Sequence, residues 1–338
     1  MRPSDSALVT LPVYATAPPD YFFVVKIRDY LFVVNRRDYE KVVTGGVAGR
    51  IGWVRVLVTG AGGYLGRVVV RAMRGRGCEV VAMGRGVDLF DAGGVRRVLE
   101  GVDVVCHLAG VGRARESVAE PLRYFRVNAG GTVALLEAMK DVGVGRLVFA
   151  STGAIYGSPE RQPMSEELPD APPHPYAASK LAAEWAIEAQ VAAGKVSARV
   201  LRLMNVAGGE DPDPTRLIPR TLAAAASGSA LEINGDGSAV RDYLHVEDAA
   251  AAFVAGVEPQ AGFARYVVGS GRGTSVLEVV AAVERITGRR VAGEHRPAVQ
   301  EPSALVADPS RAIAELGWKP TKSDIDTIIR DTHPLPRA

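Results

Sequence analysis

The stretch that decides the fold runs from Val54 to Gly66 and reads Val-Arg-Val-Leu-Val-Thr-Gly-Ala-Gly-Gly-Tyr-Leu-Gly. Its β-branched first half, Val54–Thr59, predicts a short, fully buried strand. Apolar residues then recur at helical spacing from Leu65 to Met73, which predicts an amphipathic helix after the glycines. The glycines let the backbone turn tightly and let a pyrophosphate lie against the amides at the helix start. This order of elements predicts a dinucleotide-binding loop.

Downstream of this loop, strand and helix patterns alternate. The further strands are expected at Glu79–Met83, Val104–Leu108, Leu147–Ala150 and Ala198–Leu203, and the helices at Gly94–Leu99, Thr132–Lys140 and Ala177–Ala192. Such alternation gives a parallel sheet covered by helices on both faces. With right-handed crossovers, the fold class is α/β, a Rossmann-type doubly wound sheet. After Asn205 the pattern breaks into loops with helices at Leu217–Ala226 and Ser275–Thr287, which predicts a smaller C-terminal substrate-binding lobe.

We therefore expect three parts. Residues 1–53 form an N-terminal extension, residues 54–204 with 242–258 returning form the dinucleotide-binding domain, and residues 205–241 and 259–338 form the smaller substrate-binding lobe. The extension holds an approximate repeat, Phe23–Tyr30 followed by Phe32–Tyr39, which favours either a β-hairpin or a sticky extension. It differs in composition from the rest, and valine can be encoded by an alternative bacterial start codon. Whether residues 1–53 belong to the native protein or translation starts at Val54 stays open.

Composition excludes several function classes. The chain of 338 residues is 47% hydrophobic and carries a net charge of +2, too near neutral to indicate nucleic acid or a membrane as a partner. No apolar run approaches the ~20 residues of a membrane span. A signal peptide is not expected, because Asp5 places an acid in the leader that should be basic and Pro12 interrupts the apolar run. Cys78 and Cys106 are expected as core thiols of a reducing compartment, and neither has a histidine at ligand spacing, so no metal site is predicted. We expect a cytoplasmic location.

A second candidate site is Tyr176-Ala-Ala-Ser-Lys180. Positions i and i+4 share one face of a helix, so the lysine ammonium can lie near the tyrosine. A phenol of pKa ~10 is a poor base at neutral pH, and a nearby cation favours the phenolate. Pro175 marks the helix start. Tyr176 and Lys180 are therefore predicted to be catalytic.

With its GxxGxxG spacing, the chain resembles the extended short-chain dehydrogenases/reductases of the NAD-dependent epimerase/dehydratase family from Val54 to about Pro320, most closely their UDP-glucose 4-epimerase members. The resemblance implies that Asp88 faces the adenine, that Asn128 braces the end of the fourth strand, and that Thr152 supplies the catalytic hydroxyl while Ser151 contacts the nicotinamide side. The full set of implied cofactor contacts is Gly60, Gly63, Tyr64, Leu65, Gly66, Arg85, Asp88, Leu89, Leu108, Ala109, Gly110, Asn128, Ser151, Tyr176, Lys180 and Met204.

One departure concerns the cofactor. The family usually has an acid at the end of the second strand to hold the ribose hydroxyls of NAD, and here the sequence reads Met83-Gly84-Arg85. The missing carboxylate and the nearby guanidinium tolerate the 2′-phosphate of NADP. Arg85 lying over the adenine is the other interpretation. We expect NAD, with NADP also accepted.

The resemblance also implies the substrate contacts. They are Thr152, Asn205, Arg216, Leu217, Arg241 and Arg296. Arg216 stands where the family often has an amide, and Arg241 is placed to bind a phosphate bidentately. The alignment at Arg296 requires a short insertion. Asp242 and His245 are expected to be structural, as are the closing motifs around Trp318.

The implied activity is NAD(P)-dependent 4-epimerization of a nucleotide sugar of the UDP-glucose/UDP-galactose type, through a transient 4-keto sugar, in a homodimer. An NADPH-dependent 4-keto-sugar reductase is the alternative that Arg85 suits. A 4,6-dehydratase fits less well, because that relative carries Asp-Glu after its catalytic threonine and here Gly153-Ala154 follow. An NAD(P)-sensing binding protein commonly lacks the tyrosine and lysine that this chain retains.

Overall fold

The computed structural model describes residues 22–27, 30–35, 54–299 and 302–332. Contacts divide the chain into two units, Met1–Trp53 and Val54–Ala338. In the first unit, β1 (Phe22–Ile27) pairs antiparallel with β2 (Tyr30–Asn35), with Val25 opposite Phe32. The two copies of the approximate repeat thus supply the two strands of a hairpin, the first of the two structures predicted for this segment.

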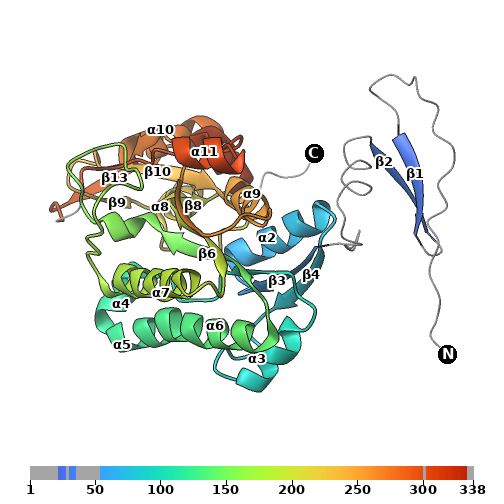
Figure 1. The fold of residues 1–338 in the computed structure, drawn as a ribbon. Coiled ribbons are helices and arrows are strands. Elements are labelled where there is room, and N and C mark those ends of the chain that lie inside the picture. The colour runs from blue at the N-terminus through green and yellow to red at the C-terminus, as the bar shows by residue number, and fades with distance from the viewer. Residues whose placement is uncertain (1–21, 28–29, 36–53, 300–301, 333–338) are drawn as a thin grey trace, which may run out of the picture. The chain divides into compact units, whose positions relative to one another are not determined.

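The second unit is built on a six-stranded parallel sheet in the order β11-β7-β6-β5-β3-β4 (Figure 1). Its strands are β3 (Arg55–Thr59), β4 (Glu79–Met83), β5 (Val104–His107), β6 (Arg146–Thr152), β7 (Ser197–Leu203) and β11 (Phe263–Val268). The doubly wound α/β fold is therefore confirmed. Strand order reverses between β3 and β5, and ligands of such sheets bind at the carboxyl ends of the strands at this point. We call this place the crevice.

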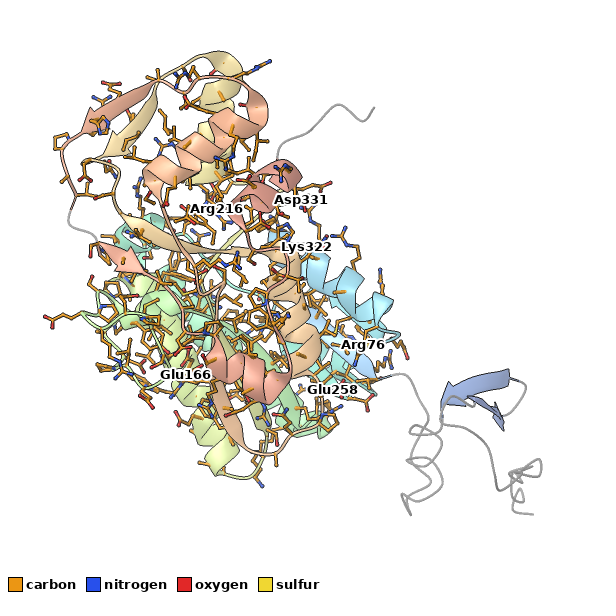
Figure 2. The ribbon with its side chains drawn as sticks, turned by 90° about the horizontal axis from the view of Figure 1, so that it is seen from above. Arg76, Glu166, Arg216, Glu258, Lys322 and Asp331 are labelled. Carbon is orange, nitrogen blue, oxygen red and sulfur yellow. The ribbon has the colours of Figure 1, made fainter. Side chains whose placement is uncertain are left out.

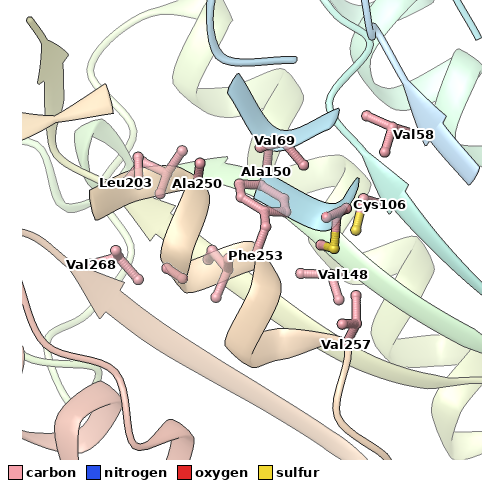
Figure 3. Close-up of a cluster of buried hydrophobic side chains, with 14 of the residues drawn as sticks. Val58, Val69, Cys106, Val148, Ala150, Leu203, Ala250, Phe253, Val257 and Val268 are labelled. Atoms are coloured by element: carbon pink, nitrogen blue, oxygen red, sulfur yellow. The ribbon is translucent and has the colours of Figure 1, made fainter. Parts of the chain in front are cut away.

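The strands alternate their side chains between two cores, as a pleated strand must. Val56 and Val58 of β3 belong to one core and Leu57 to the other. Helices α2 (Tyr64–Gly75) and α9 (Val246–Gly256) cover the first face, where Phe253 lies among Val69, Ala150 and Ala250 (Figure 3). An ion pair of 3.4 Å between Arg76 and Glu258 joins the ends of these two helices (Figure 2).

The opposite face is covered by a second group of helices. They are α3 (Ala92–Leu99), α6 (Gly131–Val142) and α7 (Pro175–Ala192). Three short segments lead into α6, namely α4 (Ala114–Ala119), α5 (Pro121–Tyr124) and the π-helix η1 (Phe125–Gly130). The sequence patterns did not reveal these three. A 3₁₀ turn, η2 (Gly153–Tyr156), follows β6.

The C-terminal lobe has a core of its own around Ile233, Val279 and Ile328. Its central strand β10 (Val240–His245) pairs with β8 (Asn205–Ala207), β12 (Gly273–Ser275) and β14 (Ala304–Leu305). The remaining elements are α8 (Leu217–Ser227), β9 (Leu231–Asn234), α10 (Val276–Thr287), β13 (Gly293–Arg296), α11 (Ser310–Leu316) and α12 (Ile325–Thr332).

The lobe does not begin cleanly at residue 259, where the sequence suggested the boundary. β11 pairs in parallel with β7 and forms an edge of the large sheet. Ala312 of α11 and Trp318 are buried in the core beside Phe253, and the Trp318 indole donates to the Asp248 carbonyl at 2.9 Å. Residues from the end of the chain therefore complete the dinucleotide-binding domain. The predicted division into domains otherwise stays a prediction.

Two further expectations concern the chain as a whole. Both cysteines are free thiols, Cys106 buried and Cys78 partly buried. Among the described residues, no helix combines the length and the apolar character that crossing a membrane requires.

Candidate active site

The glycine loop is shaped so closely that side chains would not fit at two positions. Gly60 has a φ of +68°, and a Cβ there would lie 2.7 Å from the Ala109 nitrogen. A Cβ on Gly66 would overlap the Gly60 carbonyl oxygen. At Gly62, by contrast, a Cβ would meet no atom within 4 Å, so the outer side of the loop is open. The loop therefore leaves room for a ligand beside its backbone.

The start of α2 is suited to an anion. Its N-cap, Gly63, has no side chain to cap the helix, and the first turn of α2 has no acidic residue. The first amides of a helix lack intrahelical partners and carry a partial positive charge. A diphosphate can satisfy them, so this structure fits a dinucleotide at the loop. Tyr64 begins the helix, but its hydroxyl donates to the Gly208 carbonyl of the C-terminal lobe.

The end of β5 forms the other side of the crevice. The Thr59 hydroxyl accepts hydrogen bonds of 3.1 Å from the amides of Leu108 and Ala109. Asn128, buried in η1, accepts from the Val111 amide at 2.9 Å and donates to the Val111 carbonyl at 3.1 Å. Asn128 therefore braces this segment, as the resemblance implied.

Gly110 shows how tightly the same segment approaches the helix α7. A Cβ on Gly110 would lie 2.7 Å from Asn128 Oδ1 and 3.3 Å from Lys180 Nζ. Beneath it, His107 lies between the hydroxyls of Thr59 (2.7 Å) and Thr132 (3.0 Å). Burial, and secondarily the charge of Lys180, lowers the pKa of His107 to about 3, so this imidazole is neutral.

The end of β4 is open and carries no acid. Gly84 and Arg85 are exposed there. Asp88 follows in the next loop, where its carboxylate accepts from the Phe90 amide at 3.1 Å, and Leu89 is buried beneath it. The predicted adenine contacts therefore lie at the surface beside the crevice, and their role stays a prediction.

Tyr176, Thr152 and Lys180 come together where β6 ends and α7 begins. The Thr152 side chain lies close enough to Tyr176 to lower the pKa of its phenol. Burial raises the pKa of Tyr176, and Thr152 and the positive charge of Arg216 lower it. Lys180 is buried, and its ammonium donates to the Ala150 carbonyl at 2.9 Å. The structure thus gathers the three predicted catalytic residues. The positive charge of Arg216 also acts on Tyr176, which the sequence did not indicate, and the Lys180 ammonium is held on β6.

The surroundings of Lys180 shift the pKa of its ammonium in two opposite directions. Burial lowers the pKa of Lys180 to about 8, and the Glu184 carboxylate opposes this shift. Glu184 follows Lys180 by one helical turn and is fully buried. Its Oε2 accepts hydrogen bonds from Arg202 Nη2 (2.7 Å), Arg202 Nε (3.3 Å) and Arg265 Nε (2.9 Å). The spacing 176, 180, 184 was the sequence signal for this residue, which the sequence analysis missed.

Ser151 differs from its predicted role in one respect. Its hydroxyl donates to Glu184 and is therefore committed inside the protein. Neighbouring residues of a strand face opposite sides, so Ser151 and Thr152 point apart. A nicotinamide contact made through this hydroxyl would have to break a buried charge-assisted bond.

Two aromatic residues that the sequence did not single out flank Tyr176. The buried Tyr124 ring meets it edge-on, with 6.4 Å between ring centroids. His174 stacks beside it at 5.9 Å and also caps α7, since its Nδ1 accepts from the Ala177 amide at 3.2 Å. Burial lowers the pKa of His174, which keeps this cap available as an acceptor. The Tyr176 ring is therefore held from two sides.

The predicted substrate residues divide into two groups. Asn205 donates to the Asp242 carbonyl at 3.1 Å, and its neighbour Met204, which was predicted as a cofactor contact, packs against Gly153. Arg216, just before Leu217 at the start of α8, contacts the Val206 carbonyl at 3.1 Å. These four lie around the carboxyl ends of β7 and β8.

The other predicted substrate residues are two arginines of the C-terminal lobe. On β10, Arg241 donates to the carbonyls of Val240 (2.8 Å) and Pro302 (2.9 Å). Arg296 lies on the exposed strand β13, paired with Glu232 and Glu294. Among the described residues, the ion pairs of Arg296 are to these two carboxylates, and none joins it to the other predicted substrate residues.

Asp242 and His245 have the structural roles expected of them. Asp242 is fully buried and accepts from the Ser270, Gly271 and Ala307 amides. His245 caps α9 and contacts Asp331 at 3.1 Å. In the part of the chain that the structure describes, no cluster of His, Cys, Asp and Glu is arranged to hold a metal ion.

Comparisons with known proteins agree with this geometry. The model of the NAD dependent epimerase/dehydratase family matches residues 56–269. The chain is 38% identical over 309 residues to UDP-glucose 4-epimerase of Streptomyces lividans, a match that covers 81% of this chain and 94% of the relative.

Solved structures give the same result. UDP-glucose 4-epimerase from Brucella ovis in complex with NAD has a TM-score of 0.79 at 34% identity, covering 83% of this chain and 97% of that one. UDP-glucose-4-epimerase from Stenotrophomonas maltophila with bound NAD and formylated UDP-arabinopyranose also has a TM-score of 0.79, at 31% identity, with 82% and 96% covered.

Proposed function

The chain belongs to the NAD dependent epimerase/dehydratase family, and from this premise we propose that it interconverts UDP-glucose and UDP-galactose. It is an NAD-dependent nucleotide-sugar 4-epimerase, hence an isomerase. The observation that carries the proposal is that Thr152, Tyr176 and the buried Lys180 come together where β6 ends and α7 begins.

The residues of the crevice would hold NAD at two places. The diphosphate would lie against the glycine loop and the first amides of α2, and the nicotinamide would lie near Tyr176 and Lys180. Bound NAD supplies a hydride acceptor that returns the hydride within the same catalytic cycle.

Tyr176 is the acid–base group of the reaction. It takes the proton of the sugar 4-hydroxyl as the 4-keto sugar forms, and it gives the proton back when the carbonyl is reduced. Thr152 lies beside the phenol and would align it with the 4-oxygen. The charge of Arg216 favours the phenolate and so acts against the burial that raises the Tyr176 pKa.

Inversion at C4 requires the sugar to present its other face before the hydride returns. The nucleotide must therefore be held firmly and the sugar loosely. We assign the firm contacts to Asn205, Leu217 and Arg241, whose backbone segments β8, α8 and β10 belong to one lobe. The Arg216 side chain is 45% exposed, so we also assign it a contact with a phosphate of the substrate. Arg296 is the least supported member, because its two acidic partners already neutralise it.

Incubation of the purified protein with UDP-glucose tests the function. We expect UDP-galactose to accumulate to an equilibrium mixture while the NAD content of the solution stays constant. Deoxysugar analogues of UDP-glucose would then define the sugar. Formation of a reduced product only with NADPH, in amounts matching NADPH consumed, would reject the epimerase in favour of a 4-keto-sugar reductase.

We also propose that the protein is a homodimer in the cytoplasm. Large apolar side chains are exposed on the neighbouring helical segments α4, α5, η1, α6 and α7, namely Val118, Leu122, Phe125, Val133 and Trp185. Exposed apolar residues of this kind favour a protein interface, and a second copy would cover them with the same residues. The two unpaired cysteines support a reducing compartment. Light scattering of the protein and of Leu122→Glu would test the dimer, since the variant should be monomeric.

A further inference from the structure

A segment of the C-terminal lobe, residues 208–216, is fastened to both sides of the crevice. We call it the strap. It begins with Gly208 and Gly209, which have φ values of +90° and +62°, and it ends at Arg216, the N-cap of α8. A Cβ on Gly208 would lie 2.6 Å from His245, so the start of the strap is fixed against β10. Figure 2 shows Arg216 where the C-terminal lobe meets the dinucleotide-binding domain.

The first fastening is to the side that follows β3. The Tyr64 hydroxyl at the start of α2 donates to the Gly208 carbonyl. The Arg216 guanidinium lies 5.5 Å from the centroid of the Tyr64 ring. Burial and the Asp211 carboxylate both raise the Tyr64 pKa, which keeps its hydroxyl a donor. One aromatic residue thus contacts both ends of the strap.

The second fastening is to the side that follows β5. Arg113 Nε lies 3.4 Å from Asp213 Oδ2. Arg113 is itself positioned, because its amide donates to the Tyr124 hydroxyl at 3.2 Å and its carbonyl accepts from that hydroxyl at 2.8 Å. The strap therefore spans the crevice from Tyr64 to Arg113, which follow adjacent strands of the sheet.

Inside the strap, acidic side chains fix the backbone. Asp211 accepts from the Asp213 amide at 3.1 Å and from Arg216 at 3.2 Å. Asp213 accepts from the Thr215 amide at 3.0 Å and from its hydroxyl at 2.6 Å. Each carboxylate of the strap has an arginine partner, Glu210 pairing with Arg67 at 3.7 Å. The strap can therefore lie beside a diphosphate without presenting unpaired negative charge to it.

We propose that Tyr64 and Arg113 are positioning residues that latch the strap across the bound dinucleotide and set the rate at which NAD leaves the protein. The inference rests on the proposed function only for the identity of the cofactor. An epimerase regenerates NAD in every cycle, so a latch that slows its release costs the reaction nothing. Sequence reasoning placed Tyr64 against the cofactor directly; the latch gives its hydroxyl a different partner.

The test measures NAD exchange without any sugar present, so it is independent of epimerase activity. The protein is loaded with radiolabelled NAD, mixed with excess unlabelled NAD, and sampled by rapid gel filtration. Tyr64→Phe removes one hydroxyl and should speed release about tenfold, the scale of one hydrogen bond. Tyr266→Phe is the matched control, because its hydroxyl is bonded to Glu315 at 3.0 Å, on the edge strand β11.

A second variant separates the latch from a direct contact between Tyr64 and NAD. Asp213→Asn removes the charge that pairs with Arg113 but keeps an oxygen for Thr215. It should speed release about threefold, the scale of a partly exposed ion pair. NAD release from the unchanged protein should also become faster as the ionic strength rises from about 0.01 M to about 1 M, because salt screens the ion pair. The release rate of Asp213→Asn, which lacks this ion pair, should depend less on ionic strength.

An unchanged release rate for Tyr64→Phe overturns the proposal. Faster release from Tyr64→Phe with an unchanged rate for Asp213→Asn overturns it as well, since Tyr64 would then act on NAD without the strap. Thermal unfolding of each variant without NAD checks that the change in rate does not come from a loosened fold.

Discussion

The side-chain amide of Asn128 donates a hydrogen bond of 2.9 Å to the Ser179 hydroxyl and so joins the segment after β5 to the catalytic helix. Asn128 belongs to η1, and Ser179 precedes Lys180 on α7. The same amide group also bonds both backbone groups of Val111. The buried Asn128 side chain therefore fixes the distance between the segment after β5 and the part of α7 that carries Lys180.

Asn128→Ala should lower the free energy of unfolding by about 1–3 kcal/mol, because it leaves buried polar groups of Val111 without a partner. Ser179→Ala, which spares both bonds to Val111, should cost no more than about 1 kcal/mol. Urea unfolding of the two variants measures the difference. Equal losses would mean that the bonds to Val111 contribute little.

Tyr176→Phe should retain NAD but lose turnover by at least ~100-fold, the usual scale of positioned acid–base catalysis. The ring and its contacts to Tyr124 and His174 remain, so the fold should be unaffected. Bound NAD is read from the absorbance of the protein after denaturation, and turnover from product formation with UDP-glucose. A variant with a near-normal rate would remove Tyr176 from the mechanism.

The rate should also depend on the charge of Lys180. Burial lowers the pKa of Lys180 to about 8, so the ammonium loses its proton as the pH rises through this value. The pKa of Tyr176 is raised, so the phenol does not titrate in the same range. We expect kcat/KM to fall above about pH 8. Lys180→Arg, which stays charged, should be slower but lack this decline; a decline at the same pH in that variant would assign it to another group.

The open end of β4 should make the site tolerant of NADP. Gly84 and Arg85 offer no carboxylate to repel a 2′-phosphate, whereas the epimerase reaction has no need of NADPH. The purified protein should therefore carry NAD and bind added NADP within about tenfold, a gap of ~1.4 kcal/mol. Calorimetric titration of Arg85→Ala should show a larger loss for NADP than for NAD. Equal losses would mean that Arg85 only stacks on the adenine.

Removal of residues 1–53 should leave folding and activity intact. The contacts of the chain separate at Trp53, and the family model begins to match at residue 56. A chain that starts at Val54 should show the same cooperative unfolding and the same epimerase rate as the full chain. Loss of soluble protein on truncation would show that the extension belongs to the fold.

The sequence predicted those parts of the site that depend on local pattern. The glycine loop lies between β3 and α2, and Tyr176 and Lys180 lie one turn apart on α7. Each motif is local in the sequence, so its residue spacing was enough to predict it. Five of the six strands of the large sheet followed for the same reason, because each contains a short apolar run. The ends of elements were predicted less well: α3 begins at Ala92 because the Asp91 side chain caps it, accepting from the Gly94 amide at 3.0 Å.

Features that join distant segments were not predictable in this way. The pairing of Tyr64 with Gly208 and of Arg113 with Asp213 depends on how the two lobes meet, which no local period records. The role of β11 was missed because residues 259–262 look like a domain boundary, whereas pairing with β7 decides where the strand goes. Arg216 was predicted from the sequence only as a substrate contact in the place of an amide, and the fold adds that its charge acts on Tyr176.

The core around Phe253 determines how the protein can be made. Val58 and Val69 leave the ribosome early, and the helix α9 that covers them, with Phe253 in it, is synthesised only after five of the six strands of the large sheet (Figure 3). A nascent chain that ends at Met204 therefore exposes to water the part of this apolar face that α9 covers in the complete protein. Chaperones that bind apolar surface should hold this protein until residue 268 has emerged, and a fragment cut at residue 204 should aggregate unless the segment 246–268 is supplied in trans.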